Sequence, residues 1–122
     1  MHIGEMAERS GLSSRTLRHY EAIGLLPPTG RSDGGFRVYV EEDLRRLMTI
    51  RRMKALDFST AEMGRLLQLL DIIDGSGPDA ERSIARAELD TLREDAQERR
   101  EKLARQVRRA DEFLGILDRR LE

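Results

Sequence analysis

The stretch "IGEMAERSGLSSRTLRHYEAIGLLPP", residues 3–28, decides the fold of this chain. Its helix-capping and turn residues predict two short helices, over residues 3–10 and 14–22. Gly11 suits the left-handed residue that ends the first helix, and Ser13 has the side chain of an N-cap for the second. Two short helices joined by a tight turn that contains glycine are typical of a helix-turn-helix.

A short β-hairpin is predicted after these helices. Gly24 ends the second helix, and the two prolines at 27–28 leave it in extended form. In "TGRSDGGFRVYV", residues 29–40, the run 33–35 has the composition of a turn, and apolar and polar residues alternate after it. A hairpin this short is not stable alone, so we expect it to lean on the helices as a wing.

Two more helices are predicted to follow the wing. Residues 41–56 begin with acidic side chains and end with basic ones, as the helix dipole favours. The segment "FSTAEM" after them is the strongest local signal in the chain. Ser59 and Glu62 form a capping box there, and Phe58 can pack on Met63. A fourth helix with an apolar stripe is therefore expected to begin at this point.

The chain is thus predicted to be mainly α-helical, in two parts. A winged helix-turn-helix domain that includes the helix pair covers residues 1–73, "DGSGP" at 74–78 is a linker, and one long helix covers 79–122. A helix of that length extends roughly 60 Å, too far to bury a one-sided apolar stripe against so small a fold. It needs a partner helix, most simply from a second copy of the chain. The predicted dimerisation residues of this stripe are Leu89, Leu92, Ala96, Leu103, Val107, Ala110, Leu114 and Leu117.

Composition excludes several classes of function. The absence of Cys excludes disulfides and thiolate metal sites. His2 and His19 have no neighbours at metal-binding spacing, so we expect no metal and no cofactor. No catalytic triad order, phosphate loop or nucleotide fingerprint appears, so we do not expect an enzyme. No apolar run approaches the ~20 residues of a membrane span. We expect a soluble, cytoplasmic, nucleoid-associated protein.

The net charge of −1 hides an uneven distribution. Residues 1–60 carry 10 Lys and Arg against 8 Asp and Glu, whereas residues 61–122 carry 12 against 15. A local basic face is what indicates nucleic-acid binding. The predicted DNA contacts are Ser14, Arg15, Thr16, Arg18, His19 and Tyr20 on the second helix, and Arg31, Arg37 and Tyr39 on the wing. The first turn of a recognition helix meets base edges, so Arg15 is the predicted base reader, and the later residues reach phosphates.

Other interpretations of these charges stay open. The second helix can carry an ordinary solvated face, and the hairpin can be a structural cap whose charge is incidental. The cluster Arg51, Arg52 and Lys54 is interpreted as structural, because it complements the dipole of its own helix.

The chain resembles the MerR family of bacterial transcription regulators. The resemblance covers essentially the whole chain and includes the helix-turn-helix, Arg18 with Tyr20, the G-L-L turn, "GGFRVY", the F-S-x-x-E helix start and the long last helix. It implies an antiparallel dimerisation coiled coil and a homodimer that binds palindromic operators in double-stranded promoter DNA. It also implies bending and untwisting of that DNA, which aligns the promoter for RNA polymerase. On that pattern Arg18, His19 and Tyr20 contact DNA from the helix, and Arg37 and Tyr39 from the wing.

Three departures from the family pattern matter. Asp57 stands where Gly is frequent, and Asp tolerates a left-handed conformation. Val40 stands at the N-cap position of a helix, where its side chain cannot accept the capping hydrogen bond. The chain ends at Glu122 without Cys, whereas metal and redox sensors of the family use Cys and drug sensors add a domain. The resemblance therefore supports DNA binding without identifying a signal.

Four apolar residues of the fourth helix can line an effector site or belong to the core: Met63, Leu66, Leu70 and Ile73. Alternatives to an effector-controlled regulator are a regulator without a small ligand, a coiled-coil interaction protein that no longer binds DNA, and an architectural DNA-binding protein.

Overall fold

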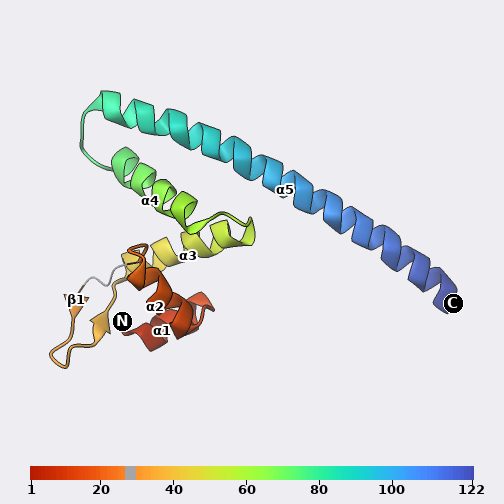
Figure 1. The fold of residues 1–122 in the computed structure, drawn as a ribbon, viewed down its shortest axis with the longest axis horizontal. Coiled ribbons are helices and arrows are strands. Elements are labelled where there is room, and N and C mark those ends of the chain that lie inside the picture. The colour runs from red at the N-terminus through yellow and green to blue at the C-terminus, as the bar shows by residue number, and fades with distance from the viewer. Residues whose placement is uncertain (27–29) are drawn as a thin grey trace. The chain divides into compact units, whose positions relative to one another are not determined.

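The computed structural model describes residues 1–26 and 30–122 and divides into two compact units, Met1–Gln68 and Leu69–Glu122. The elements are drawn in Figure 1 and are α1 (Ile3–Ser10), α2 (Ser14–Ala22), β1 (Gly30–Arg31), β2 (Arg37–Val38), α3 (Glu41–Ala55), α4 (Thr60–Asp74) and α5 (Asp79–Leu121). The first unit runs from α1 into α4, and the second holds the end of α4 and α5. The prediction of a mainly α-helical chain with a winged helix-turn-helix is confirmed.

The turn between α1 and α2 has the geometry that its residues predict. Gly11 ends α1 with a φ of 73°, and its N–H donates to the Ala7 carbonyl at 3.0 Å. Ser13 caps α2, because its Oγ accepts the Thr16 N–H at 3.1 Å. Both helix ends are thereby satisfied within a turn short enough to keep α1 packed against α2.

Arg51 has a structural role, as predicted, but on a different helix. Its Nη1 donates to the Ser10 carbonyl at the end of α1, at 2.7 Å. A Cβ added at Gly11 would lie 3.3 Å from the same nitrogen, so the small turn residue makes room for the guanidinium. A cation at the C-terminal end of a helix satisfies free carbonyls and complements the helix dipole. Here Arg51 of α3 does this for the end of α1.

The first unit has one hydrophobic core drawn from every helix and from the wing. Leu17, Leu26, Leu47 and Ile50 are fully buried. The remaining buried hydrophobic residues of this unit are Met6, Tyr20, Leu25, Tyr39, Met53, Phe58, Met63, Leu66 and Leu67. Because Leu17 and Tyr20 are three residues apart, they place one face of α2 in this core and leave the opposite face to solvent.

The wing is a two-stranded antiparallel hairpin in which Gly30 pairs with Val38 and Arg31 with Arg37. The Ser32 N–H donates to the Phe36 carbonyl at 2.8 Å and closes the turn. Both residues of β2, Arg37 and Val38, are half-buried, and Tyr39, which follows the strand, is buried. The predicted extended exit at 27–28 and the first predicted wing residue, Thr29, lie outside the described residues.

The starts of α3 and α4 show how the unusual residues are accommodated. Val40 makes no side-chain cap, as predicted, and the Asp43 carboxylate instead accepts the Val40 N–H at 2.9 Å. The predicted capping box is confirmed: the Ser59 N–H donates to Glu62 Oε1 at 2.9 Å, and the Glu62 N–H donates to Ser59 Oγ at 3.1 Å. Asp57 adopts the left-handed conformation, with a φ of 64°.

The second unit is dominated by α5, which spans 43 residues. Leu89, Leu92 and Ala96 of the predicted stripe are half-buried within the single chain, whereas the stripe from Leu103 onward is exposed. The two compact units meet between Gln68 and Leu69, which is inside the continuous helix α4. The non-helical segment between α4 and α5 is a different place in the chain, residues 75–78. The boundary at 74–78 therefore remains a prediction. Among the described residues, none of the helices is both long and apolar enough to cross a bilayer.

Candidate nucleic-acid interface

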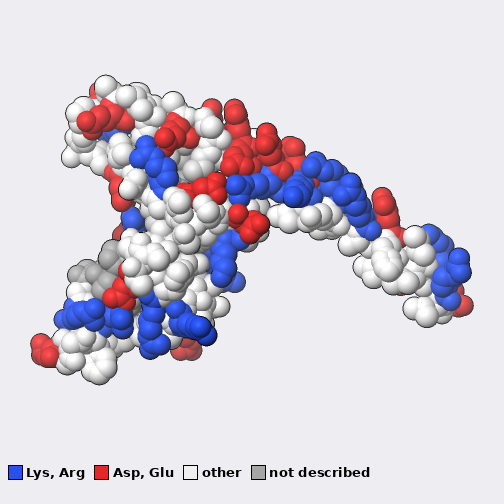
Figure 2. Space-filling model, viewed as in Figure 1, with Lys and Arg blue, Asp and Glu red and all other residues white. Residues whose placement is uncertain are grey.

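The outer face of α2 presents three basic side chains to solvent. Arg15, Arg18 and His19 are exposed, and neither arginine donates a hydrogen bond to any of the described residues. They share a face because they are spaced at i, i+3 and i+4. In Figure 2, Lys and Arg side chains gather at the lower part of the first unit, while α5 carries separate runs of acidic and of basic side chains. The free arginines of α2 are the groups that can meet an anionic partner.

The hydroxyl side chains of the first turn are less free than these cations. Thr16 Oγ1 lies 2.9 Å from Ser13 Oγ, so it is part of the helix cap. Ser14 is half-buried at the start of the helix. Arg15 is exposed and binds none of the described residues, and its role as a base reader stays a prediction.

A hollow of about 460 Å³ runs along α2 and brings in one residue that the sequence did not assign to the site. Arg15 and His19 line it from α2, and Lys54 lines it from the end of α3, together with Asp57. The sequence pattern predicts only a structural role for Lys54, because of its place in its own helix. The proximity of Lys54 to α2 depends on the tertiary packing of α3. Local sequence therefore carries no signal for it.

A second hollow, of about 510 Å³, joins α2 to the wing. Arg18 lines it from α2, Arg37 from β2 and His2 from the start of the chain, next to the exposed Phe36. One predicted cation of the helix, Arg18, and one of the wing, Arg37, therefore come together at one concave surface.

Two predicted contact residues have their side chains in the core. Tyr20 is 4% exposed and Tyr39 is 1% exposed. Burial raises the pKa of both phenols. The Tyr39 hydroxyl is enclosed and has no hydrogen-bond partner among residues 1–26 and 30–122. Both rings therefore belong to the core of the first unit, and contact of either residue with DNA stays a prediction.

Both wing arginines are bound to Glu21, a residue of α2 that the sequence did not single out. Arg37 donates through Nε to one carboxylate oxygen, and Arg31 donates through Nη2 to the other at 3.4 Å. Arg31 Nη1 also donates to the Gly35 carbonyl at 3.2 Å. Glu21 of α2 thus holds both wing arginines, although ten or more residues of sequence separate it from each of them.

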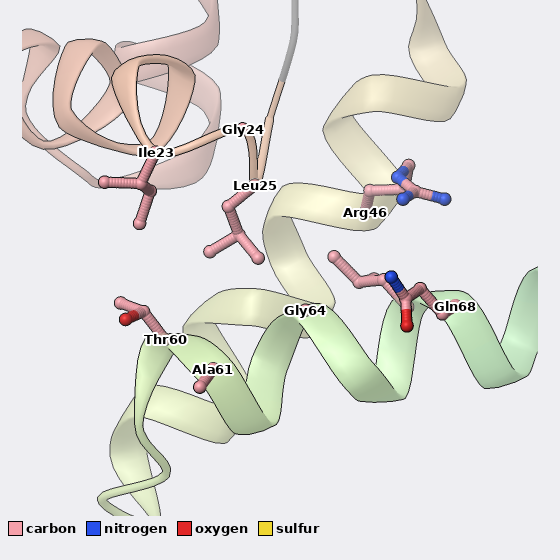
Figure 3. A pocket seen from close by; sticks show the side chains of 9 residues that line it. Ile23, Gly24, Leu25, Arg46, Thr60, Ala61, Gly64 and Gln68 are labelled. Carbon is pink, nitrogen blue, oxygen red and sulfur yellow. The ribbon is translucent and has the colours of Figure 1, made fainter.

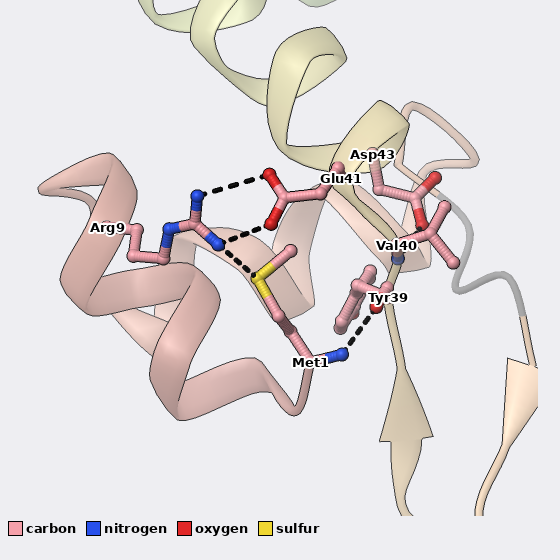
Figure 4. A network of polar contacts seen from close by, with 6 residues as sticks. All are labelled: Met1, Arg9, Tyr39, Val40, Glu41 and Asp43. Atoms are coloured by element: carbon pink, nitrogen blue, oxygen red, sulfur yellow. Dashed lines mark hydrogen bonds and ion pairs between the residues drawn. The ribbon is translucent and has the colours of Figure 1, made fainter.

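A polar network ties the base of the wing to α1 and α3 (Figure 4). The Met1 and Tyr39 backbones exchange hydrogen bonds, at 2.6 and 2.7 Å. Arg9 binds both oxygens of the Glu41 carboxylate, at 2.6 and 3.1 Å, and these hydrogen bonds lower the pKa of that carboxyl. The network fixes the point at which β2 turns into α3, although its exposed ion pair contributes little to stability.

The first unit also contains a hollow away from the basic face of α2 (Figure 3). It has a volume of about 400 Å³ and lies between Ile23 and Leu25 after α2, Arg46 of α3, and a face of α4 that includes Gly64 and Gln68. The residues predicted as a possible effector site lie on other faces of α4, and two of them, Met63 and Leu66, are buried core residues. The effector site remains a prediction.

The geometry of α2 and the wing offers a surface for binding an anion. Within the described parts of the chain, no group of three His, Cys, Asp or Glu side chains is placed to hold a metal ion. What the site offers instead is a helix bearing unpaired cations beside a hairpin that carries another arginine. Such a surface fits the phosphates and base edges of duplex DNA.

Comparison with known proteins agrees with this geometry. The family described as "MerR HTH family regulatory protein" matches residues 1–70. The uncharacterized HTH-type transcriptional regulator PA4778 of Pseudomonas aeruginosa is 52% identical over 69 residues, which are 57% of this chain and 52% of that protein. The regulator HmrR of Rhizobium leguminosarum is 43% identical over 89 residues, which are 73% of this chain and 67% of that protein. This chain thus spans about half the length of the first relative and two thirds of the second.

A solved structure extends the similarity beyond the matched family region. HiNmlR, described as a MerR family regulator lacking the sensor domain and bound to promoter DNA, aligns with a TM-score of 0.63 and 27% identity. The alignment covers 98% of this chain and 86% of HiNmlR. The three proteins are all named as regulators.

Proposed function

The chain belongs to the MerR family of helix-turn-helix regulatory proteins, and on this premise we propose that it is a transcription regulator that binds promoter DNA as a homodimer. The observation that carries the proposal is the outer face of α2, where Arg15 and Arg18 are exposed and bind none of the described residues. The promoter-bound state of HiNmlR, a protein of similar fold, supports it.

The homodimer is proposed from the surface of α5. Leu103, Leu114 and Leu117 are 42%, 54% and 42% exposed in the single chain, and all three lie on the stripe of the coiled-coil pattern. Leaving such a stripe in water is unfavourable, and a second α5 in antiparallel orientation would cover it. Two α2 helices would then be related by a two-fold axis, which suits a palindromic operator. We propose that the dimer bends and untwists its operator and so acts on RNA polymerase through the DNA.

Selection from a random-sequence duplex library tests this function. We expect the protein to enrich a palindromic sequence, and its affinity for that duplex to fall steeply as salt rises, because cations of the protein displace counterions from phosphates. The shuffled duplex is the control. No enrichment, together with no mobility shift on any duplex at low salt, would contradict the proposal and favour the coiled-coil interaction protein.

Replacing Arg15 with alanine is expected to change base preference. A bidentate arginine–guanine contact provides about 1–3 kcal/mol of discrimination, so the enriched sequence should become degenerate at one position of each half-site. Arg18→Ala removes the same charge from the same face and should weaken all duplexes alike. Repeating the selection with both variants checks the assignment, and an unchanged preference in Arg15→Ala would assign that residue to phosphate.

A further inference from the structure

Glu21 lies on α2 three residues after Arg18, and its carboxylate is the most enclosed group of the wing contact. Its side chain is 15% exposed, whereas those of Arg31 and Arg37 are 52% and 33% exposed. A carboxylate so close to a DNA-binding face would be expected to repel phosphate. Its two ion pairs suggest a purpose that outweighs this repulsion.

The two arginines use their nitrogens differently. Arg37 binds Glu21 through Nε, and its two terminal nitrogens donate to none of the described residues. Arg31 uses both terminal nitrogens inside the protein, one on Glu21 and one on the Gly35 carbonyl. Arg37 can therefore bind a phosphate through its free nitrogens while it stays bound to Glu21, whereas Arg31 would have to give up internal bonds to do so.

The location of Arg37 agrees with this difference. On β2 it lies two residues before the buried Tyr39, so it belongs to the strand face that turns toward the helices. It also lines the hollow that contains Arg18, whose guanidinium binds none of the described residues. A phosphate in that hollow would meet one cation from α2 and one from the wing.

We propose that Glu21 is a positioning residue for DNA binding, because it orients the Arg37 guanidinium so that its free nitrogens meet a phosphate beside Arg18. The ion pair between Glu21 and Arg31 has a different role, which is to hold the wing on α2. This inference rests on the proposed function. It removes Arg31 from the predicted DNA contacts and assigns a negatively charged residue a favourable role in binding an anion. Orientation in advance lowers the entropy cost of immobilising a long side chain on binding.

The Glu21→Gln variant tests the proposal on the duplex selected by the wild-type protein, because it removes the charge without changing the shape. We expect affinity to fall roughly 3- to 10-fold and the slope of log K against log salt to become shallower by about 0.9 for each phosphate that the variant no longer binds. Glu8→Gln is the matched control, since Glu8 is exposed on α1, binds none of the described residues and carries the same charge. It should bind with the wild-type slope.

A double-mutant cycle separates positioning from a general effect of charge. Arg37→Ala should weaken all duplexes alike and reduce the slope as Glu21→Gln does, and the double variant should be no weaker than Arg37→Ala alone. Arg31→Ala should lower the melting temperature and leave the slope unchanged. Additive effects of the two substitutions on affinity, or a reduced slope in Arg31→Ala, would overturn the assignment.

Arg37→Lys provides a second route if Glu21→Gln fails to fold by circular dichroism. It retains the charge and Glu21, but an ammonium group cannot hold the carboxylate through one nitrogen and a phosphate through two others. The same reduction of slope is expected, and an unchanged slope would overturn the proposal. If Glu21→Gln binds as tightly as Glu8→Gln, only this inference fails. If the wild-type protein binds no duplex, the proposed function fails and this inference with it.

Discussion

Replacing Leu103 and Leu117 with glutamate is expected to convert the protein into a monomer and to reduce its affinity for the selected duplex by at least about 100-fold. Both leucines are 42% exposed on the apolar stripe of α5. In the proposed dimer they would be covered, and a buried unpaired carboxylate there is strongly unfavourable. A monomer also loses the gain in affinity that comes from two linked half-site contacts.

Multi-angle light scattering measures the first effect, and titration of the labelled duplex measures the second. The control combines Gln97→Glu with Arg105→Gln, which changes the net charge of α5 by the same amount at positions outside the stripe. It should remain dimeric. A dimer that survives both leucine substitutions would show that another surface holds the two copies together.

Replacing Leu17 with alanine is expected to lower the free energy of unfolding of the first unit by about 2–5 kcal/mol. Leu17 is fully buried and belongs to the same helix as the free arginines. Its truncation leaves a cavity between α2 and the rest of the core, so the helix that carries the predicted DNA contacts loses its support.

Urea unfolding at a fixed protein concentration measures this destabilisation, since the proposed dimer makes stability depend on concentration. Ile23→Ala is the control, because Ile23 is 45% exposed at the end of the same helix. The Ile23→Ala variant should lower the free energy of unfolding clearly less than Leu17→Ala does. Equal costs for the two variants would mean that burial of Leu17 is not what holds α2 in place.

The helix boundaries could be predicted because the signals for them are local. A cap, a left-handed residue and a capping box each involve residues within four positions of one another, so Ser13, Gly11 and Ser59 act through the sequence directly around them. Periodicity likewise assigned the inner face of α2, which carries Leu17, and the exposed stripe of α5.

The roles of several charged residues could not be predicted, because they depend on which elements meet. Arg51 binds a carbonyl 41 residues away, and Arg9 binds a carboxylate 32 residues away. Lys54 at the end of α3 and Arg15 of α2 line the same hollow, although they lie far apart in the sequence. Tyr39 matches the pattern of a surface wing residue, yet it is buried in the core, and its backbone pairs with that of Met1.

The sequence by itself determined the order of the helices, the hairpin between them and the presence of cations on α2, since each follows from local spacing, and its motifs carried the family resemblance. Only the tertiary structure decided which cations are free. Arg15 and Arg18 stay unpaired among the described residues, while Arg31 and Arg37 are bound to Glu21. The physical reason is that an ion pair depends on distance in space, and packing of the wing on α2 brings together side chains that the chain itself keeps apart.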